Sequence, residues 1–272
     1  CMEKENNRKP EVRLGTHGED YGNWMPVSML RLVGGLLVLA VALAALSFAV
    51  FRLTVLDVIF IIAAIILLSL LCWIAWIRRQ YAFGGGGMME RVHQTLLSHL
   101  DYDGKGTLLD VGCGSGALAI RAALTWQSAQ VTGIDYWGAA YGYGQAMCEK
   151  NAASEGVGSR CTFRHGDANR LDFPDESFDA VVSNYVYHNI TGADKQELLL
   201  ETLRVLKKGG VFALNDEMKP QMYGDMEAFA QKLRDMGYEE VRLVDTATEV
   251  FGSHGRAAMM MLGDSRMLVG RK

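Results

Sequence analysis

Two uncharged apolar stretches, each long enough to cross a lipid bilayer, constrain this 272-residue chain more than any other feature. Residues 32–51 read LVGGLLVLAVALAALSFAVF, and residues 58–77 read VIFIIAAIILLSLLCWIAWI. At about 1.5 Å per residue, twenty helical residues span roughly 30 Å, the thickness of the hydrocarbon core of a bilayer. Because lipid offers the backbone no hydrogen-bond partner, a single segment crosses it only as a helix. The sequence therefore predicts a hairpin of two transmembrane helices joined by residues 52–57.

Other interpretations of these stretches fit less well. A secretory signal peptide lies nearer the N-terminus and has a shorter apolar core, and buried helices of soluble proteins are rarely apolar on every face. Basic residues flank the pair on both outer sides, with Arg31 before it and Arg78 and Arg79 after it, whereas the connection holds only Arg52. The positive-inside rule then predicts that the N-terminus and the chain beyond Arg79 both face the cytoplasm.

The net charge and the spacing of the cysteines argue against some classes of ligand and partner. The net charge of −4 gives no reason to expect nucleic acid as a partner. The five cysteines form no CxxC pair and show no zinc-type spacing, so we expect reduced thiols in a cytosol-facing domain and no metal site.

Residues 88–272 show the alternation of an α/β domain. Apolar strand-like segments at 107–111, 130–135, 178–183 and 210–215 are separated by helix-like stretches that include 138–153 and 193–206. Strands that alternate with helices indicate a parallel sheet covered by helices. We therefore expect four parts, which are a cytoplasmic N-terminal segment (1–29), a transmembrane hairpin (30–79), a glycine-rich tether or lid (80–87) and an α/β domain (88–272).

The first strand runs into a glycine-rich turn, LLDVGCGSG at 108–116. Such a turn lets backbone N–H groups approach a ligand closely. Read as GxGxxA, it fits a dinucleotide site. Three features favour a different cofactor, namely Asp110 directly before the turn, the early third glycine Gly116, and the stretch HGDANRLDF after the third strand region.

Four stretches in this order resemble the class I S-adenosylmethionine (SAM)-dependent methyltransferases. They are LLDVGCGSG (108–116), VTGIDYW (131–137), RHGDANRLDFPDESFDAVVSN (164–184) and LRVLKKGGVFALND (203–216), and the resemblance covers about residues 88–270. The nearest group methylates quinones, sterols and other small molecules. The resemblance implies a seven-stranded Rossmann-like sheet with helices on both faces and an antiparallel last strand, expected at 266–272.

The resemblance also assigns cofactor roles. The glycine turn would pass close to the methionine portion of SAM, with Asp110 orienting its amino end. Asp135 would accept both ribose hydroxyls, since a carboxylate accepts two donors, and Tyr136 would pack on the adenine. Asp167 and the backbone N–H of Ala168 would bond the adenine. The expected cofactor set is Asp110, Gly112, Cys113, Gly114, Gly116, Asp135, Tyr136, Asp167, Ala168 and Asn184; Cys113 is expected there as a small residue and not as a nucleophile.

The segment NYVYHNI (184–190) follows the fourth strand and should face the transferred methyl group. A histidine has a pKa suited to a general base near neutral pH, which makes His188 a candidate, although a structural or pocket-lining role is the alternative that is favoured until its reach to a proton is known. Tyr185 and Tyr187 alternate in direction, so only one of them should face the pocket, and Tyr187 is the second catalytic candidate.

The function expected from these features is methyl transfer from SAM, leaving S-adenosylhomocysteine, to a small lipophilic acceptor at the bilayer. Residues 81–87 join the hairpin to the domain, and a four-residue glycine tether reaches only about 14 Å. Tyr81 and Phe83 could therefore form a lid over the substrate. Two alternatives remain at this point, a SAM-binding membrane sensor or scaffold without catalysis and an NAD-dependent membrane reductase.

Overall fold

The computed structural model describes residues 14–15, 18–51, 54–83, 87–138 and 143–272. The chain forms two compact units, one made of residues 23–87 and the other of residues 1–22 together with 88–272. We call them the helical hairpin unit and the methyltransferase-fold unit.

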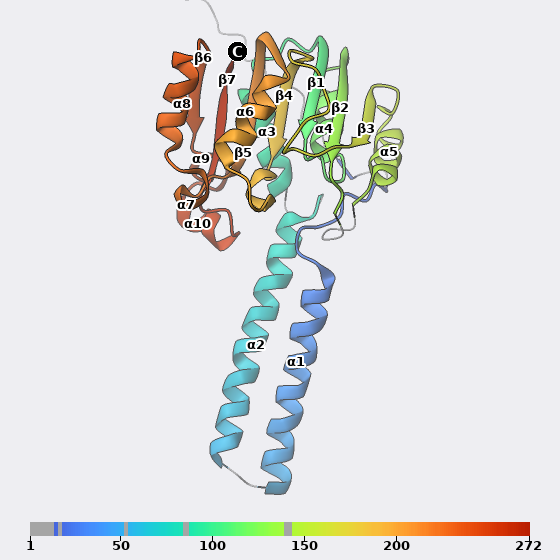
Figure 1. The fold of residues 1–272 in the computed structure, drawn as a ribbon. Coiled ribbons are helices and arrows are strands. Elements are labelled where there is room, and N and C mark those ends of the chain that lie inside the picture. The colour runs from blue at the N-terminus through green and yellow to red at the C-terminus, as the bar shows by residue number, and fades with distance from the viewer. Residues whose placement is uncertain (1–13, 16–17, 52–53, 84–86, 139–142) are drawn as a thin grey trace, which may run out of the picture. The chain divides into compact units, whose positions relative to one another are not determined.

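The helical hairpin unit contains α1 (Val27–Leu46), continued by a π-helical stretch (Ser47–Phe51), and α2 (Thr54–Tyr81) (Figure 1). By length and composition, Val27–Val50 and Thr54–Tyr81 are apolar enough to cross a membrane. Most of their large apolar side chains are exposed, and Phe48 and Val55 are each 74% exposed. Faces this apolar are unfavourable in water and suit a lipid environment.

Polar and aromatic contacts join the two ends of this unit. The Asn23 side-chain amide donates to the Arg78 carbonyl at 2.8 Å, and the Arg78 guanidinium donates to the Met25 carbonyl. The rings of Trp24 and Tyr81 lie 5.5 Å apart. Tyr81, one of the two aromatic residues expected in a lid, is the last residue of α2 and is buried. The other residues of the expected lid are 82–87, of which 84–86 lie outside the described part.

The methyltransferase-fold unit is built on a seven-stranded sheet of order β3-β2-β1-β4-β5-β7-β6 in the described part of the chain. The parallel strands β1 to β5 are Gly106–Val111, Ala129–Asp135, Cys161–His165, Phe178–Asn184 and Leu206–Glu217. β6 (Glu239–Val244) and β7 (Ser265–Arg271) complete the sheet, and β7 runs antiparallel to both neighbours. The expected α/β fold with an antiparallel last strand is confirmed.

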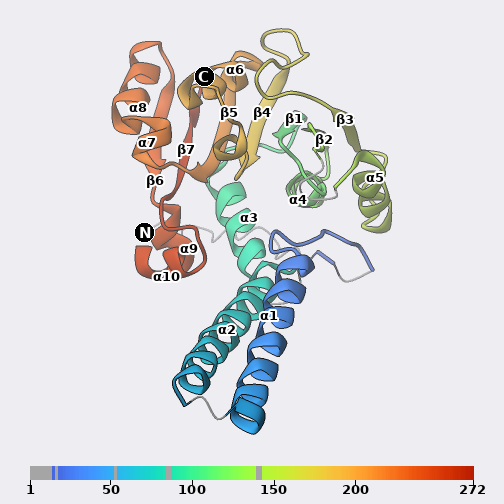
Figure 2. The same ribbon diagram turned by 60° about the horizontal axis from the view of Figure 1, so that its bottom comes forward.

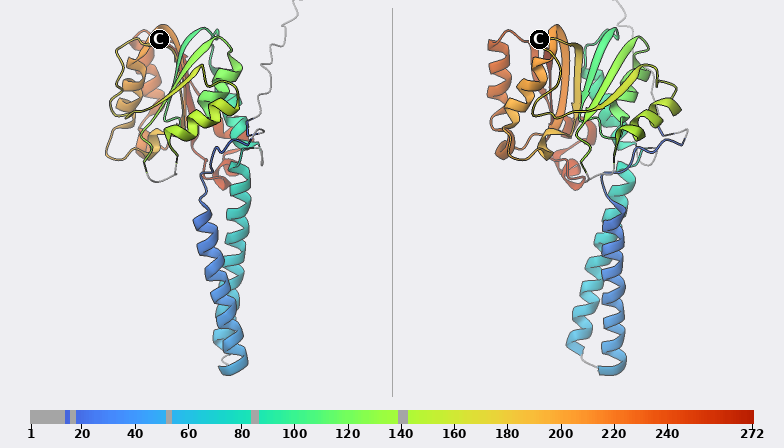
Figure 3. Two further views of the ribbon diagram at one scale, coloured as in Figure 1. Left: turned by 90° about the vertical axis from the view of Figure 1, so that its right-hand side faces the viewer. Right: turned by 45° about the vertical axis from the view of Figure 1, so that its right-hand side comes forward.

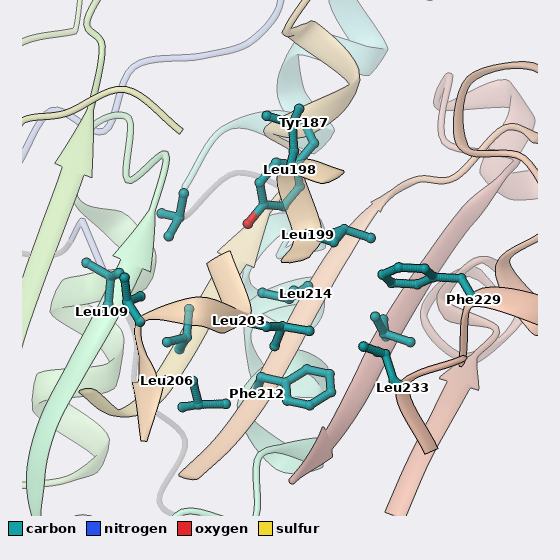
Figure 4. Packing of buried hydrophobic residues seen from close by; sticks show 14 of the residues in the cluster. Leu109, Tyr187, Leu198, Leu199, Leu203, Leu206, Phe212, Leu214, Phe229 and Leu233 are labelled. Carbon is teal, nitrogen blue, oxygen red and sulfur yellow. The ribbon is translucent and has the colours of Figure 1, made fainter. Parts of the chain in front are cut away.

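Helices cover both faces of this sheet (Figures 1 and 3). α3 (Met88–His99) and α4 (Ala117–Thr125) lie on one face, α6 (Lys195–Arg204) and α8 (Met226–Asp235) on the other, and α5 (Gln145–Ser154) beside β3. Short helices α7 (Pro220–Tyr223), α9 (Thr246–Phe251) and α10 (His254–Met259) follow β5 and β6. Leucines and aromatic residues of α6, α8, β4 and β5 form the core between helices and sheet (Figure 4).

Several predicted boundaries need correction. The helix expected over 138–153 begins only at Gln145, and residues 139–142 are outside the described part. The helix expected over 193–206 ends at Arg204, because Leu206 already pairs with Phe178 as the start of β5. That strand extends to Glu217, which pairs with Ser265 of β7. Pairing with neighbours on both sides therefore lengthens the strand beyond its apolar stretch.

The segment before the hairpin also folds differently from the expected separate N-terminal part. Its described residues, 14, 15 and 18–22, belong to the methyltransferase-fold unit, and we call them the N-terminal strap. Leu14 and Tyr21 are 1% and 4% exposed, and Asn151 of α5 exchanges hydrogen bonds with the backbone of Asp20. The sequence gives no period or motif for this docking, which depends on partners more than 130 residues away.

Candidate cofactor and active site

The glycine turn between β1 and α4 forms the centre of the candidate site. Gly112 adopts φ 74°, and a Cβ atom there would lie 2.3 Å from a methyl group of Val186. Only glycine accepts both this conformation and this close approach. The amides of Gly112 and Cys113 donate to the Ile134 carbonyl at 2.8 and 2.9 Å. The turn is therefore fixed to β2 and lies directly against the segment that carries His188.

Asp110 lies buried beneath the turn, with 1% of its surface exposed. The Ala119 backbone N–H at the start of α4 bonds to its carboxyl group, and the Oδ2 atom has no hydrogen-bond partner among the described residues. Burial raises the pKa of Asp110 from 3.8 to about 8. A buried carboxyl oxygen without a partner is costly unless a ligand supplies one. The cationic amino group of SAM fits this requirement.

Asp135, the last residue of β2, faces the same turn. Its Oδ2 accepts from the Gly114 N–H at 2.8 Å, and its Oδ1 accepts from the Trp137 N–H at 2.7 Å. Each carboxylate oxygen can accept more than one hydrogen bond, so capacity remains for a pair of hydroxyls. The Tyr136 ring is 67% exposed and lies 5.1 Å from the ring of His165, which leaves an aromatic surface beside Asp135.

The remaining cofactor candidates lie around this turn. The Gly166 N–H donates to the Asp135 carbonyl at 3.0 Å, which brings the loop with Asp167 and Ala168 beside Asp135. Asp167 Oδ1 accepts from the backbone and side-chain amides of Asn169. Burial raises the pKa of the Cys113 thiol well above 9.0. A thiol held in this way is a poor nucleophile, in keeping with a small packing residue.

His188 forms the most distinctive contact of the site. Its Nδ1 lies 2.5 Å from Oδ1 of Asp216, near the end of β5. Asp216 is fully buried, and its Oδ2 also accepts from the Tyr187 and His188 amides at 2.7 and 3.2 Å. The His188 side chain is 29% exposed. The carboxylate therefore fixes one ring nitrogen and leaves Nε2 available to a ligand.

Sequence reasoning missed Asp216, although it was part of a quoted motif. It stands in the run LNDE at the end of a strand, where polar residues are unusual for a buried segment. Tyr187, by contrast, is fully buried in the core, and its hydroxyl lies 2.9 Å from the Thr202 hydroxyl (Figure 4). Tyr187 is therefore a core residue in this structure, and Asp216 is the residue that contacts the His188 ring.

Asn184 is held by a polar chain that crosses the sheet. Its Oδ1 accepts from Asn215 Nδ2 at 2.8 Å, and Asn215 Oδ1 accepts from the Thr246 hydroxyl at 2.8 Å. Tyr185 follows with φ 57°, an uncommon conformation for a bulky residue, and its hydroxyl lies 2.8 Å from that of Ser265. These contacts direct the chain from β4 back over the glycine turn.

The N-terminal strap closes the site on its α5 side. Asn151 Nδ2 donates to the Asp20 carbonyl and to the Ser115 carbonyl of the glycine turn. The Tyr143 ring lies beside both Gly22 and Gly114, at 2.4 and 3.5 Å from the positions that a Cβ atom would take there. The strap therefore shares two neighbours with the turn.

Comparison with known proteins agrees with this geometry. Residues 109–214 match the sequence model described as "Methyltransferase domain". The 27-O-demethylrifamycin SV methyltransferase of Amycolatopsis mediterranei is 32% identical over 154 residues, 56% of this chain and 52% of that protein. The sterol 24-C-methyltransferase ERG6B of Gibberella zeae is 29% identical over 157 residues, 57% of this chain and 38% of that protein. The chain spans about half or less of the length of these curated relatives.

Among solved structures, a geranyl diphosphate methyltransferase in complex with GPP and sinefungin superposes with a TM-score of 0.56. The match covers 72% of this chain and 82% of that chain at 16% identity, which shows a shared fold.

Fold, glycine turn and family match together define a class I SAM-dependent methyltransferase domain with a SAM-binding site. The relatives that this domain resembles include methyltransferases named for a rifamycin, a sterol and demethylmenaquinone.

Proposed function

We propose that this protein is a membrane-anchored enzyme that transfers the methyl group of SAM to a small lipophilic acceptor. The observation that carries the proposal is the His188–Asp216 pair, held beside the glycine turn by the contact between Val186 and Gly112. A domain that only sensed SAM would have no need for an oriented histidine at this position.

Each cofactor residue has a defined task in this proposal. The unpartnered oxygen of Asp110 binds the amino group of SAM, and the amides and carboxylate around Gly114 and Asp135 bind its ribose. Tyr136 offers its exposed ring to the adenine. Bound SAM supplies an activated methyl group on a sulfonium, so the protein contributes mainly positioning and acid–base chemistry.

His188 acts as the general base. Because Nδ1 is bonded to Asp216, the neutral ring presents an unprotonated Nε2 to an acceptor hydroxyl or amine. The buried carboxylate then stabilises the imidazolium that forms when Nε2 takes the proton. The surrounding buried acids, Asp216 and Glu217, disfavour an anionic acceptor. We therefore expect a neutral acceptor with a proton to lose.

Three observations support membrane anchoring and a lipophilic acceptor. Both helices of the hairpin unit satisfy the length and composition of membrane spans. The strap and the chain from Met88 belong to one compact unit, so both ends of the hairpin return to the same domain. The relatives named above are a methyltransferase of a demethylrifamycin and a sterol methyltransferase. From the positive-inside rule we infer that the domain and the N-terminus face the cytoplasm.

Methyl transfer from labelled SAM into a polarity-fractionated membrane extract tests this proposal on the full chain in nanodiscs. We expect label in the apolar fraction, and His188→Asn should lower turnover by about 10²–10⁴-fold, the usual contribution of a general base. His99→Asn is the matched control, because His99 is 22% exposed and also pairs with a carboxylate, that of Glu249. SAM binding without any transfer would instead support a sensor or scaffold, and label only in polar compounds would exclude a lipophilic acceptor.

A further inference from the structure

Exposed apolar side chains of the methyltransferase-fold unit gather at one edge of its sheet. Four methionines in the described part of this unit are at least 39% exposed, namely Met222, Met236, Met259 and Met261. Met222 lies in α7, directly after β5, while Met259 ends α10 and Met261 follows it, both after β6. These three therefore lie at the carboxyl edge of the parallel strands, the edge that also holds the glycine turn (Figure 2). Met236 lies before β6, at the opposite edge.

The opposite, amino edge has a different character. The loops that lead into β1 and β4 expose Asp101, Asp103, Asp175 and Glu176. Single exposed apolar residues are normal on any protein surface. Three of the four exposed methionines lie at the carboxyl edge, whereas the amino edge exposes charged side chains of both signs, Lys105 and Lys208 among them.

The chain itself links the carboxyl edge to the hairpin. Gly22, the last residue of the strap, lies beside Tyr143, and the Tyr143 ring lies beside Gly114 of the glycine turn. Val27 begins α1 five residues later, a reach of at most about 18 Å. The strap at this edge is therefore joined to the first candidate membrane helix by only a few residues of chain.

We propose that the carboxyl-edge methionines Met222, Met259 and Met261 insert into the interfacial layer of the bilayer. This rests on the membrane anchoring proposed above. Methionine is flexible and apolar, so it adapts to a disordered lipid surface. Lys219 and Arg256 are exposed beside Met222 and Met259 in the chain and suit anionic phospholipid headgroups. His188 lies at the same edge, so an acceptor dissolved in lipid would reach it without crossing water.

Site-specific fluorescence on the full chain in nanodiscs tests this contact. Cys1, Cys72 and Cys161 are replaced by serine, whereas Cys113 and Cys148 are buried and remain. An environment-sensitive fluorophore is attached to Met259→Cys, Met261→Cys or Met236→Cys. The nanodiscs contain phosphatidylcholine and phosphatidylglycerol with a headgroup-level quencher lipid. Met236 is the matched control because it is 55% exposed, the same as Met259.

We expect blue-shifted emission and roughly threefold stronger lipid quenching at 259 and 261 than at 236, because interfacial residues lie only about 5–10 Å deep. Equal quenching at the three positions, in protein that co-floats with lipid, would overturn the membrane contact and leave the anchoring intact. Protein that does not float with lipid would overturn the anchoring itself. Omitting phosphatidylglycerol should weaken quenching at 259, next to Arg256 in the chain, more than at 236.

Discussion

At the residue scale, burial of the Asp110 carboxyl group in the candidate SAM site lowers the stability of the unliganded protein near neutral pH. Its carboxyl group is buried, one oxygen has no partner in the described part of the chain, and burial raises the pKa to about 8. A carboxyl group whose pKa is raised by folding contributes stability that is fully present below its ordinary pKa of 3.8. That contribution is lost as the pH rises through about 8. Near neutral pH the free protein therefore holds Asp110 largely protonated until a cation arrives.

Because Asp110 ionises as the pH rises, we expect SAM to bind more tightly at pH 7.5 than at pH 6. Binding of the ammonium group requires ionised Asp110, so affinity should increase by at most about tenfold per pH unit in this window. Calorimetry in two buffers of different ionisation enthalpy should show release of nearly one proton at pH 6.5.

Asp110→Asn should abolish this pH dependence and weaken SAM binding. The unliganded variant should be more stable than the parent at pH 8, because it removes the cost of a buried ionisable group. Affinity that is flat from pH 6 to 7.5 in the parent would mean that Asp110 is already ionised and does not bind the amino group.

At the element scale, the N-terminal strap depends on α5. Asn151 is 1% exposed and joins the Asp20 backbone to the Ser115 carbonyl through both ends of its amide. Buried amide bonds of this kind contribute about 1 kcal/mol each, and an unsatisfied buried partner costs about 1–3 kcal/mol. One side chain therefore links the strap and the glycine turn.

Asn151→Leu should release the strap and loosen the turn together. We expect faster amide hydrogen exchange over residues 18–22 and 112–116, a lower melting temperature and weaker SAM binding. Lys150→Ala, an exposed neighbour on α5, should leave all three unchanged. Faster exchange confined to the strap would show that the turn does not depend on it.

At the scale of the whole molecule, the order of segments in the chain constrains topology. The strap and the rest of the methyltransferase-fold unit form one compact unit, with the hairpin inserted between them. A single span between these two segments would put them on opposite sides of a bilayer. Two spans return the chain to its starting face, which is consistent with the two candidate helices.

Impermeant thiol labelling of intact cells should therefore miss cysteines placed before the hairpin and after it. Lys4→Cys and Asp103→Cys should react only after the membrane is permeabilised, and Thr54→Cys, at the connection between the helices, should react without it. These variants are made with Cys1 and Cys72 replaced by serine. Labelling from outside at Lys4→Cys alone or Asp103→Cys alone would rule out the hairpin.

The sequence by itself determined the fold class, the two apolar helices and the location of the glycine turn. These features are local: apolar length, strand–helix alternation and glycine spacing are set by neighbours along the chain. It also placed Asp135 and His188 at strand ends. Only the tertiary structure decided that Asp216 orients His188, that Tyr187 belongs to the core and that the strap docks on α5. Each of these contacts joins residues that the fold brings together from separate segments, so no pattern of neighbours along the chain predicts it.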